Sequence, residues 1–415
     1  MYQIKTLPNG VRLVTCPMEG YRSAALGFWV GAGSRQESPA ENGAPHFIEH
    51  MAYKGTHRRS AADLAREMDA LGGQFNAFTT KECTCFHVRG LDEHLPLFTD
   101  LLTDQFFHSK FDEKDVALER GVILEEIGMY ADTPEDLTAE RLYEGVYPDS
   151  PLSRPILGTK ETLEGMTGAF LKEYQEKHYL PGDIVVSLAG SFRESDVERL
   201  AEAFSSLEGG KNPPAEQAVY RPAILATEKP IEQNHLTLAW PSLPYGSEKR
   251  YALQLLSTVL GAGMSSRLFQ TVREEKGLCY SVYSYGAGHA DTGLFCVYTA
   301  LGKSTEAEAI TTILNVVSEA ARNGITREEL ERAREQSKAH VVMGLESTQS
   351  LMNHMGRCLL LTGTIPTPDE ILRRYDAVTL EEVTELARTI FDPAGLSLSA
   401  VGQVRDEEGY RSLLS

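Results

Sequence analysis

The sequence predicts an α+β protein made of two duplicated domains, each a mostly antiparallel sheet with helices packed on one face. Alternating apolar and polar residues at 83–89 and 278–284 indicate half-buried strands. An amphipathic helix followed by an apolar strand that ends in glycine occurs twice, within 169–190 and within 380–402. Because this order recurs in both halves, it indicates an internal duplication.

The domain boundaries follow from a stretch rich in glycine and proline near the midpoint of the chain, at 208–216. The 415 residues exceed one ordinary core, since domains commonly hold ~100–200 residues. We therefore predict an N-terminal domain over 1–208, a linker over 209–220 and a C-terminal domain over 221–415.

Each half is expected to run from a strand into a helix and to close on a second strand. These elements are 24–30, a helix that begins near Pro45, and 184–190 in the first half, and 235–241, 249–260 and 396–402 in the second. Pro45 suits the first turn of a helix, because its missing N–H is not needed there. The polar residues that follow Pro45 have no counterpart between Tyr251 and Leu268, so the chemistry is not duplicated.

Composition excludes several classes of partner. The formal net charge of −19 argues against nucleic acid, because phosphate binding needs a basic surface. The longest apolar stretches, such as 24–30, are far shorter than the ~18 residues of a membrane span, so no membrane association is expected. Residues 1–10 lack the pattern of a signal peptide, and six scattered cysteines are too sparse for a disulfide scaffold. We therefore expect a cytoplasmic protein with reduced thiols.

The segment His46-Phe-Ile-Glu-His50 carries the strongest chemical signal in the sequence. On a helix at ~100° per residue, His46 and His50 lie about 40° apart, so both imidazoles can reach one cation beside the carboxylate of Glu49. The spacing H-x-x-E-H is that of the inverted-motif zinc peptidases. A helix that carries two histidines by chance shows the same pattern, so the motif alone leaves the metal open.

A third metal ligand is expected from a second helix, because a catalytic zinc takes three protein ligands and one open position. On a helical wheel, Glu119 and Glu126 lie within an apolar stripe with Val122 and Ile123, whereas Glu125 points about 120° away. Carboxylates on a buried face are costly unless they are paired or bound to a metal. The alternative is that both glutamates lie at the margin of the stripe and pair with surface arginines.

Two segments resemble the pitrilysin family, which includes insulin-degrading enzyme and the mitochondrial processing peptidases. Residues 43–56, Gly-Ala-Pro-His-Phe-Ile-Glu-His-Met-Ala-Tyr-Lys-Gly-Thr, resemble its active-site segment, and 119–130 resemble its distal-glutamate helix. The separation from His46 to Glu126 (126 − 46 = 80) also suits the family. The similarity extends over most of the chain and is densest over 25–160 and 250–300.

The resemblance implies a role for each of these residues. His46, His50 and Glu126 would hold one Zn²⁺ per chain, and Glu119 would orient a ligand histidine. Glu49 would take the proton of a water whose pKa the zinc lowers towards ~7, and would later deliver it to the leaving amine. Histidine and carboxylate ligands also accept manganese or cobalt.

The same resemblance implies a substrate-binding strand and a substrate-binding pair. Asn76 and Ala77 would belong to an edge strand to which the peptide backbone adds, although an ordinary strand after a Gly-Gly turn shows the same pattern. Arg273 and Tyr280 match the family pair that binds substrate near the scissile bond, where a tyrosine hydroxyl can donate to a developing oxyanion. Without the resemblance, both would be ordinary surface residues.

The length matches the short branch of the family, in which two chains pair to form a chamber. We therefore expect a dimer, either of identical chains or with a dissimilar partner, that encloses unstructured peptides in extended form. Arg273 and Tyr280 are expected to act across the dimer on the partner's zinc. The rival interpretations are a non-catalytic assembly subunit of the same fold and a peptidase dedicated to one precursor peptide. Retention of the five motif residues argues against the first of these.

Overall fold

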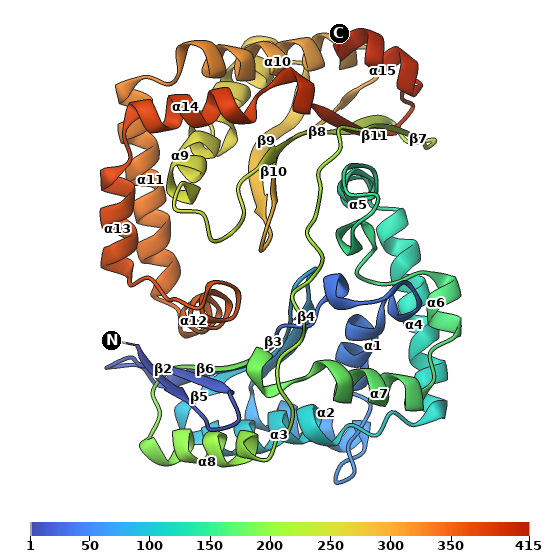
Figure 1. The fold of residues 1–415 in the computed structure, drawn as a ribbon, viewed down its shortest axis with the longest axis vertical. Helices are drawn as coiled ribbons and strands as arrows, with labels where there is room; N and C mark the ends of the chain where they lie inside the picture. The colour runs from blue at the N-terminus through green and yellow to red at the C-terminus, as the bar shows by residue number, and fades with distance from the viewer. Residues whose placement is uncertain (1, 415) are drawn as a thin grey trace. The chain divides into compact units, whose positions relative to one another are not determined.

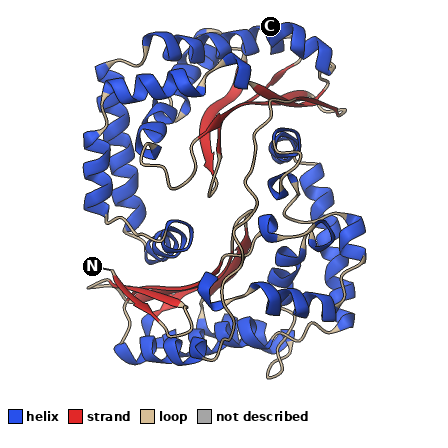
Figure 2. Cartoon of the chain, viewed as in Figure 1, coloured by secondary structure: helices blue, strands red, loops and turns tan. Residues whose placement is uncertain are grey.

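A computed structural model describes residues 2–414 and divides the chain into two compact units (Figure 1). Unit 1 comprises the residues up to Ile127, Arg154–Glu216 and Met343–Thr367; unit 2 comprises Gly128–Ser153, Gln217–Val342 and the residues from Pro368 onward. Each unit contains one sheet with its own helices, and the α+β fold class predicted from the sequence is confirmed (Figure 2). Among the described residues, no helix has the length and hydropathy needed to cross a bilayer.

Unit 1 is built on a six-stranded sheet in the order β1-β2-β6-β3-β5-β4. Its strands are β1 (Gln3–Thr6), β2 (Arg12–Pro17), β3 (Ser23–Val30), β4 (Gln74–Thr79), β5 (Thr84–Leu91) and β6 (Ile184–Gly190). Neighbouring strands are antiparallel except for β2 and β6, which run parallel. Strand β4 pairs with β5 alone and therefore forms an edge of the sheet.

The helices of unit 1 come mainly from the first half of the chain. They are α1 (Ala44–Met51), α2 (Ala61–Leu71), α3 (Leu95–His108), most of α4 (Glu113–Ala131), α6 (Lys160–Glu164), α7 (Gly168–His178), α8 (Glu194–Ser205) and α12 (Thr348–Thr362). Helix α2 shows how local sequence defines these boundaries. The Ser60 side chain accepts a hydrogen bond from the Asp63 N–H at the start of α2, and Gly72 ends the helix with a φ of 61°.

Both faces of this sheet are buried. Alternate residues of β3 point to opposite faces: Phe28 packs in the main core with α1, α3 and α7, whereas Trp29 packs against Met352 and its neighbours on α12. Helix α12 can approach this closely because residue 356 is glycine. A Cβ on Gly356 would lie 2.1 Å from Nε1 of Trp29.

Unit 2 repeats the arrangement with a five-stranded sheet in the order β7-β11-β8-β10-β9. Its strands are β7 (Ile224–Glu228), β8 (Gln233–Ser242), β9 (Cys279–Gly288), β10 (Gly293–Gly302) and β11 (Ser397–Gly402), with β7 and β11 parallel. Its helices are α5 (Pro134–Val146), α9 (Arg250–Gly261), α10 (Glu306–Asn323), most of α11 (Arg327–Leu345), α13 (Pro368–Ala377), α14 (Leu380–Ile390) and α15 (Glu407–Leu414). A π-helix, Phe269–Glu275, precedes β9.

The two halves of the chain exchange one helix each. Helix α5, from the first half, packs against residues of β8 and β10 in unit 2, while α12, from the second half, packs in unit 1. In both units the exchanged helix covers the sheet face opposite the main core. The predicted boundaries at 208 and 221 stay a prediction, since they describe chain order rather than these compact units.

Candidate metal centre and substrate groups

The metal-binding motif lies on α1, whose start is fixed by a buried carboxylate. Oε1 of Glu37 accepts a hydrogen bond from the Gly43 N–H at 2.9 Å, and Oε2 accepts one from Nδ2 of Asn42 at 2.7 Å. Gly43 has a φ of 99°, a conformation that favours glycine, and a Cβ there would lie 2.9 Å from Cα of Gly158. The backbone before His46 is therefore held in one conformation.

His46, His50 and Glu126 come together in unit 1, with their ligand atoms all within 4.8 Å of one another. Oε2 of Glu126 lies 3.6 Å from Nε2 of His46 and 3.4 Å from Nε2 of His50. Ligand atoms ~2.0–2.2 Å from a tetrahedral zinc would lie roughly 3.3–3.6 Å apart, so the donor set and its spacing fit that ion. Among residues 2–414, these three form the one cluster of this kind.

Glu119 lies directly behind His50. Its Oε1 is 2.8 Å from Nδ1 of His50, and its Oε2 contacts Nζ of Lys54. Because Glu119 is only 5% exposed, this carboxylate is shielded from water and is paired on both sides. With Nδ1–H donated to Glu119, His50 directs the lone pair of Nε2 towards Glu126 and the cation position.

His46 is held in the neutral form that binds metal. Burial, aided by the neighbouring His50, lowers the pKa of His46 to about 3. The two rings lie 4.6 Å apart between centroids. Nδ1 of His46 is buried without a hydrogen-bond partner among the described residues, so this imidazole lacks the supporting carboxylate that His50 has in Glu119.

Glu49 lies beside the metal cluster without belonging to it. Oγ1 of Thr79, at the end of β4, donates a hydrogen bond to Oε2 of Glu49 at 2.6 Å. Burial raises the pKa of Glu49, and the nearby Glu126 raises it further, while the bond from Thr79 opposes the shift. A carboxylate with a raised pKa next to a metal position is suited to accept and return a proton.

Comparison with known proteins identifies the family. The model described as insulinase (peptidase family M16) matches residues 14–160, and the model described as peptidase M16 inactive domain matches residues 165–337. A protein of Bacillus subtilis described as uncharacterized zinc protease YmxG is 43% identical over 93% of this chain and 95% of its own length. The chain belongs to peptidase family M16.

Further relatives agree with this assignment. An uncharacterized zinc protease of Streptomyces coelicolor is 40% identical to this M16 chain over 98% of it and 90% of the relative. Two crystal structures show the same fold at 20–21% identity: a peptidase M16 inactive domain from Pseudomonas fluorescens (TM-score 0.91, covering 98% of each chain) and a protease from Helicobacter pylori (TM-score 0.90, covering 97% of this chain and 99% of that one).

The other residues singled out in this M16 sequence lie at two places. Asn76 and Ala77 are on the edge strand β4, where the Ala77 N–H is bonded to Oδ1 of Asn76 at 2.8 Å. Arg273 and Tyr280 are in unit 2, where the guanidinium of Arg273 lies 4.9 Å from the ring centre of Tyr280. Tyr280 is 74% exposed, which leaves its hydroxyl accessible.

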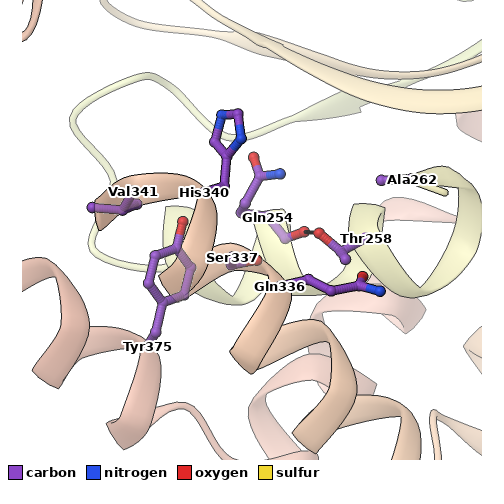
Figure 3. A pocket seen from close by; sticks show the side chains of 8 residues that line it. All are labelled: Gln254, Thr258, Ala262, Gln336, Ser337, His340, Val341 and Tyr375. Atoms are coloured by element: carbon purple, nitrogen blue, oxygen red, sulfur yellow. Dashed lines mark hydrogen bonds between the residues drawn. The ribbon is translucent and has the colours of Figure 1, made fainter. Parts of the chain in front are cut away.

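Unit 2 also contains a pocket of about 400 Å³ (Figure 3). It is lined from α9 by Gln254 and Thr258, from the end of α9 by Ala262, from α11 by Gln336, Ser337, His340 and Val341, and from α13 by Tyr375. None of these side chains is a carboxylate, so the pocket lacks the acidic ligand present in unit 1.

Three supporting residues were missed by the sequence reasoning. Glu37, Lys54 and Thr79 each contact a motif residue or the backbone that precedes the motif. Lys54 lies inside the segment that resembles the family motif, so it had a local signal. Glu37 and Thr79 had none: Glu37 bonds to the loop that precedes the motif, which carries no recognisable pattern, and the partner of Thr79 is set by tertiary packing. Val122, expected on the buried stripe of α4, is instead 50% exposed, because only the narrower stripe of Val116, Glu119 and Ile123 packs inward.

Proposed function

We propose that this M16 protein is a zinc-dependent endopeptidase that hydrolyses unstructured peptides, with one Zn²⁺ per chain held by His46, His50 and Glu126. The observation that carries the proposal is the convergence of two imidazoles and one carboxylate, with Glu126 at the spacing that a tetrahedral zinc requires from each histidine and with Glu49 adjacent but outside the cluster. The names of the relatives, which describe zinc proteases, agree with it. When bound, zinc supplies a Lewis acid that polarises the scissile carbonyl and acidifies water.

Residues of the chain would transfer the proton, orient His50 and bind the substrate. Glu49 takes a proton from the attacking water and returns it to the leaving amine, a role for which its raised pKa suits it. Glu119 and Lys54 keep His50 oriented. Asn76 and Ala77, on the edge strand β4, would bind the substrate backbone in extended form.

We further propose that two identical chains pair to enclose the substrate, and that Arg273 and Tyr280 act at the partner's metal centre. The exposure of Tyr280 and its location outside the unit that carries the metal ligands support this arrangement. Its hydroxyl would donate to the scissile carbonyl oxygen as negative charge develops there. A protein that is monomeric by light scattering while it cleaves peptides would contradict this part of the proposal. The six free cysteines suit the reducing conditions of the cytoplasm, where we place the protein.

The test of the peptidase is hydrolysis of a panel of unstructured peptides by the wild type, the chelator-treated wild type and Glu49→Gln. We expect cleavage that depends on metal and that Glu49→Gln abolishes while it retains zinc. Zinc-loaded protein that cleaves no member of the panel would favour a peptidase dedicated to one precursor. Protein that binds no zinc and cleaves nothing would favour the non-catalytic subunit.

A further inference from the structure

The carboxylate of Glu49 has a single hydrogen-bond partner within residues 2–414, the hydroxyl of Thr79. A separation of 2.6 Å is typical of a hydroxyl that donates to an ionised carboxylate. The bond engages Oε2, and Oε1 makes no hydrogen bond to the described residues. One oxygen is therefore held by the protein, and the other is left for the reacting groups.

Thr79 is itself anchored by the sheet. It is the last residue of β4 and lies directly across from Thr84 on β5, with the two hydroxyl oxygens 3.4 Å apart. Thr84 is fully buried, and its hydroxyl donates to the carbonyl of Ala32 at 2.8 Å. The sheet therefore fixes the position of Thr79, and the hydrogen bond from Thr79 fixes the carboxylate of Glu49, which belongs to α1.

Strand β4, whose Thr79 binds Glu49, is also an edge strand of the sheet. Ala77 precedes Thr79 by two residues, so their side chains share one face of β4. Its N–H does not pair with β5 but is bonded to the side chain of Asn76. A peptide that added to this edge would therefore dock on the strand that orients the base.

We propose that Thr79 is a positioning residue for Glu49, and that a peptide seated on β4 meets a base whose orientation is set by that same strand. This inference rests on the proposed peptidase function. Within residues 2–414, the hydroxyl of Thr79 has hydrogen-bond partners in Glu49 and Thr84 and in none of the three metal-binding residues. Its removal should therefore slow the chemical step without weakening substrate or metal binding.

The experiment compares steady-state kinetics of the wild type, Thr79→Val and Thr79→Ser on one cleaved peptide. Valine keeps the shape of threonine and removes the hydroxyl; we expect kcat to fall about 10- to 100-fold with KM changed by less than about two-fold, since small misplacements of a catalytic group have effects of this size. Serine retains the hydroxyl and should restore most of the rate. Zinc content and Tm should stay close to those of the wild type.

Two controls separate positioning from general damage. Thr103→Val removes the hydroxyl of another half-buried threonine of unit 1, which donates only to the carbonyls of its own helix, and should leave kcat unchanged. In a Glu49→Gln background, which has no activity left to lose, Thr79→Val should leave zinc content and Tm unchanged. If the wild type is active and Thr79→Val is equally active, the positioning role of Thr79 is overturned while the peptidase function stands. The same holds if Thr79→Val lowers kcat and Thr79→Ser does not restore it. A wild type that binds no zinc and cleaves nothing would overturn the peptidase function, and the role of Thr79 with it.

Discussion

Helices α1 and α9 occupy the same place in the two units, but they carry different chemistry. Each follows the first long strand of its sheet's core and is succeeded by a glycine with a positive φ, Gly55 at 112° and Gly263 at 103°. Aligning these glycines (263 − 55 = 208) places Gln254 at the position of His46 (46 + 208 = 254) and Thr258 at that of His50 (50 + 208 = 258). The imidazoles of His46 and His50 thus correspond to the amide of Gln254 and the hydroxyl of Thr258.

The second helix of each site shows the same difference. Helices α4 and α11 each have 19 residues, and counting from their first residues places His340 at the position of Glu126 (340 − 327 = 126 − 113 = 13). Ala333 takes the position of Glu119 (333 − 327 = 119 − 113 = 6). The buried carboxylate that supports His50 in unit 1 is therefore replaced by a methyl group in unit 2.

Gln254, Thr258 and His340 line one pocket, so the backbone still brings these positions together where the ligand chemistry is absent (Figure 3). The comparison teaches that the duplicated frame sets where a site can form, while a few polar side chains decide whether it binds metal. The family model that covers Gln254 and Thr258 is described as an inactive domain, which agrees with that conclusion.

The largest difference between the two positions is expected from paired alanine substitutions. His46→Ala should reduce peptide hydrolysis by at least about 10³-fold, because a metal contributes several kcal/mol of transition-state stabilisation. Gln254→Ala, at the matching position, should leave the rate within about two-fold, as expected of a surface substitution outside the site. Equal losses of kcat/KM in the two variants would show that the two positions do not differ in function.

Lys54 should contribute next, through zinc affinity. Lys54→Met leaves Glu119 buried without its cation, which should loosen His50 and weaken zinc binding roughly 10- to 100-fold. Lys160→Met, which removes an exposed lysine of unit 1, serves as the matched control. Competition with a chromophoric chelator measures both affinities. Unchanged zinc affinity in Lys54→Met would show that Lys54 does not support zinc binding.

The metal ligands of unit 1 can be introduced at the matching positions of unit 2. The triple variant Gln254→His, Thr258→His and His340→Glu should bind a second zinc, but about 10- to 100-fold more weakly than the native site. The reason is that Ala333 and Ala262 stand where Glu119 and Lys54 support the native histidine. Titration of the metal-free protein with zinc would show this second, weaker event. Two sites of equal affinity would mean that the supporting carboxylate and lysine matter little.

The smallest expected effect concerns stability of the metal-free protein against pH. The folded-state pKa of His46 is about 3, below its ordinary value near 6.5. Between these values the unfolded chain binds the extra proton, so this histidine destabilises the fold progressively as pH falls from about 6.5. His46→Gln should lose less stability than the wild type between pH 7.5 and pH 5 in urea unfolding with chelator present. Parallel pH profiles would contradict a buried, neutral His46.

Local patterns singled out the clustered side chains because these obey helical periodicity. The i and i+4 spacing of His46 and His50, and the seven-residue step from Glu119 to Glu126, place each pair on one helix face, and the structure has them there. The alternation of apolar residues likewise predicted the strands at 83–89 and 278–284, whereas the edge strand with Asn76 followed from the family resemblance.

Features that depend on tertiary packing could not be predicted. Amphipathicity shows that α5 and α12 each bury a face, but it does not say which sheet covers it, so the exchange of helices was not foreseen. The bond between Thr79 and Glu49 joins residues 30 positions apart on different elements, and no sequence signal specifies it. The exposure of Val122 has the same origin, since the width of the buried stripe depends on what packs against it.

We expect unit 1 to hold the metal and the matching position of unit 2 to hold none. The decisive measurement is the zinc content of the purified wild type, Glu126→Gln and His340→Gln, by inductively coupled plasma mass spectrometry after dialysis. We expect one zinc per chain in the wild type and in His340→Gln, and a marked loss in Glu126→Gln. Full zinc content in Glu126→Gln, or its loss in His340→Gln, would show that the metal is not held by unit 1 alone.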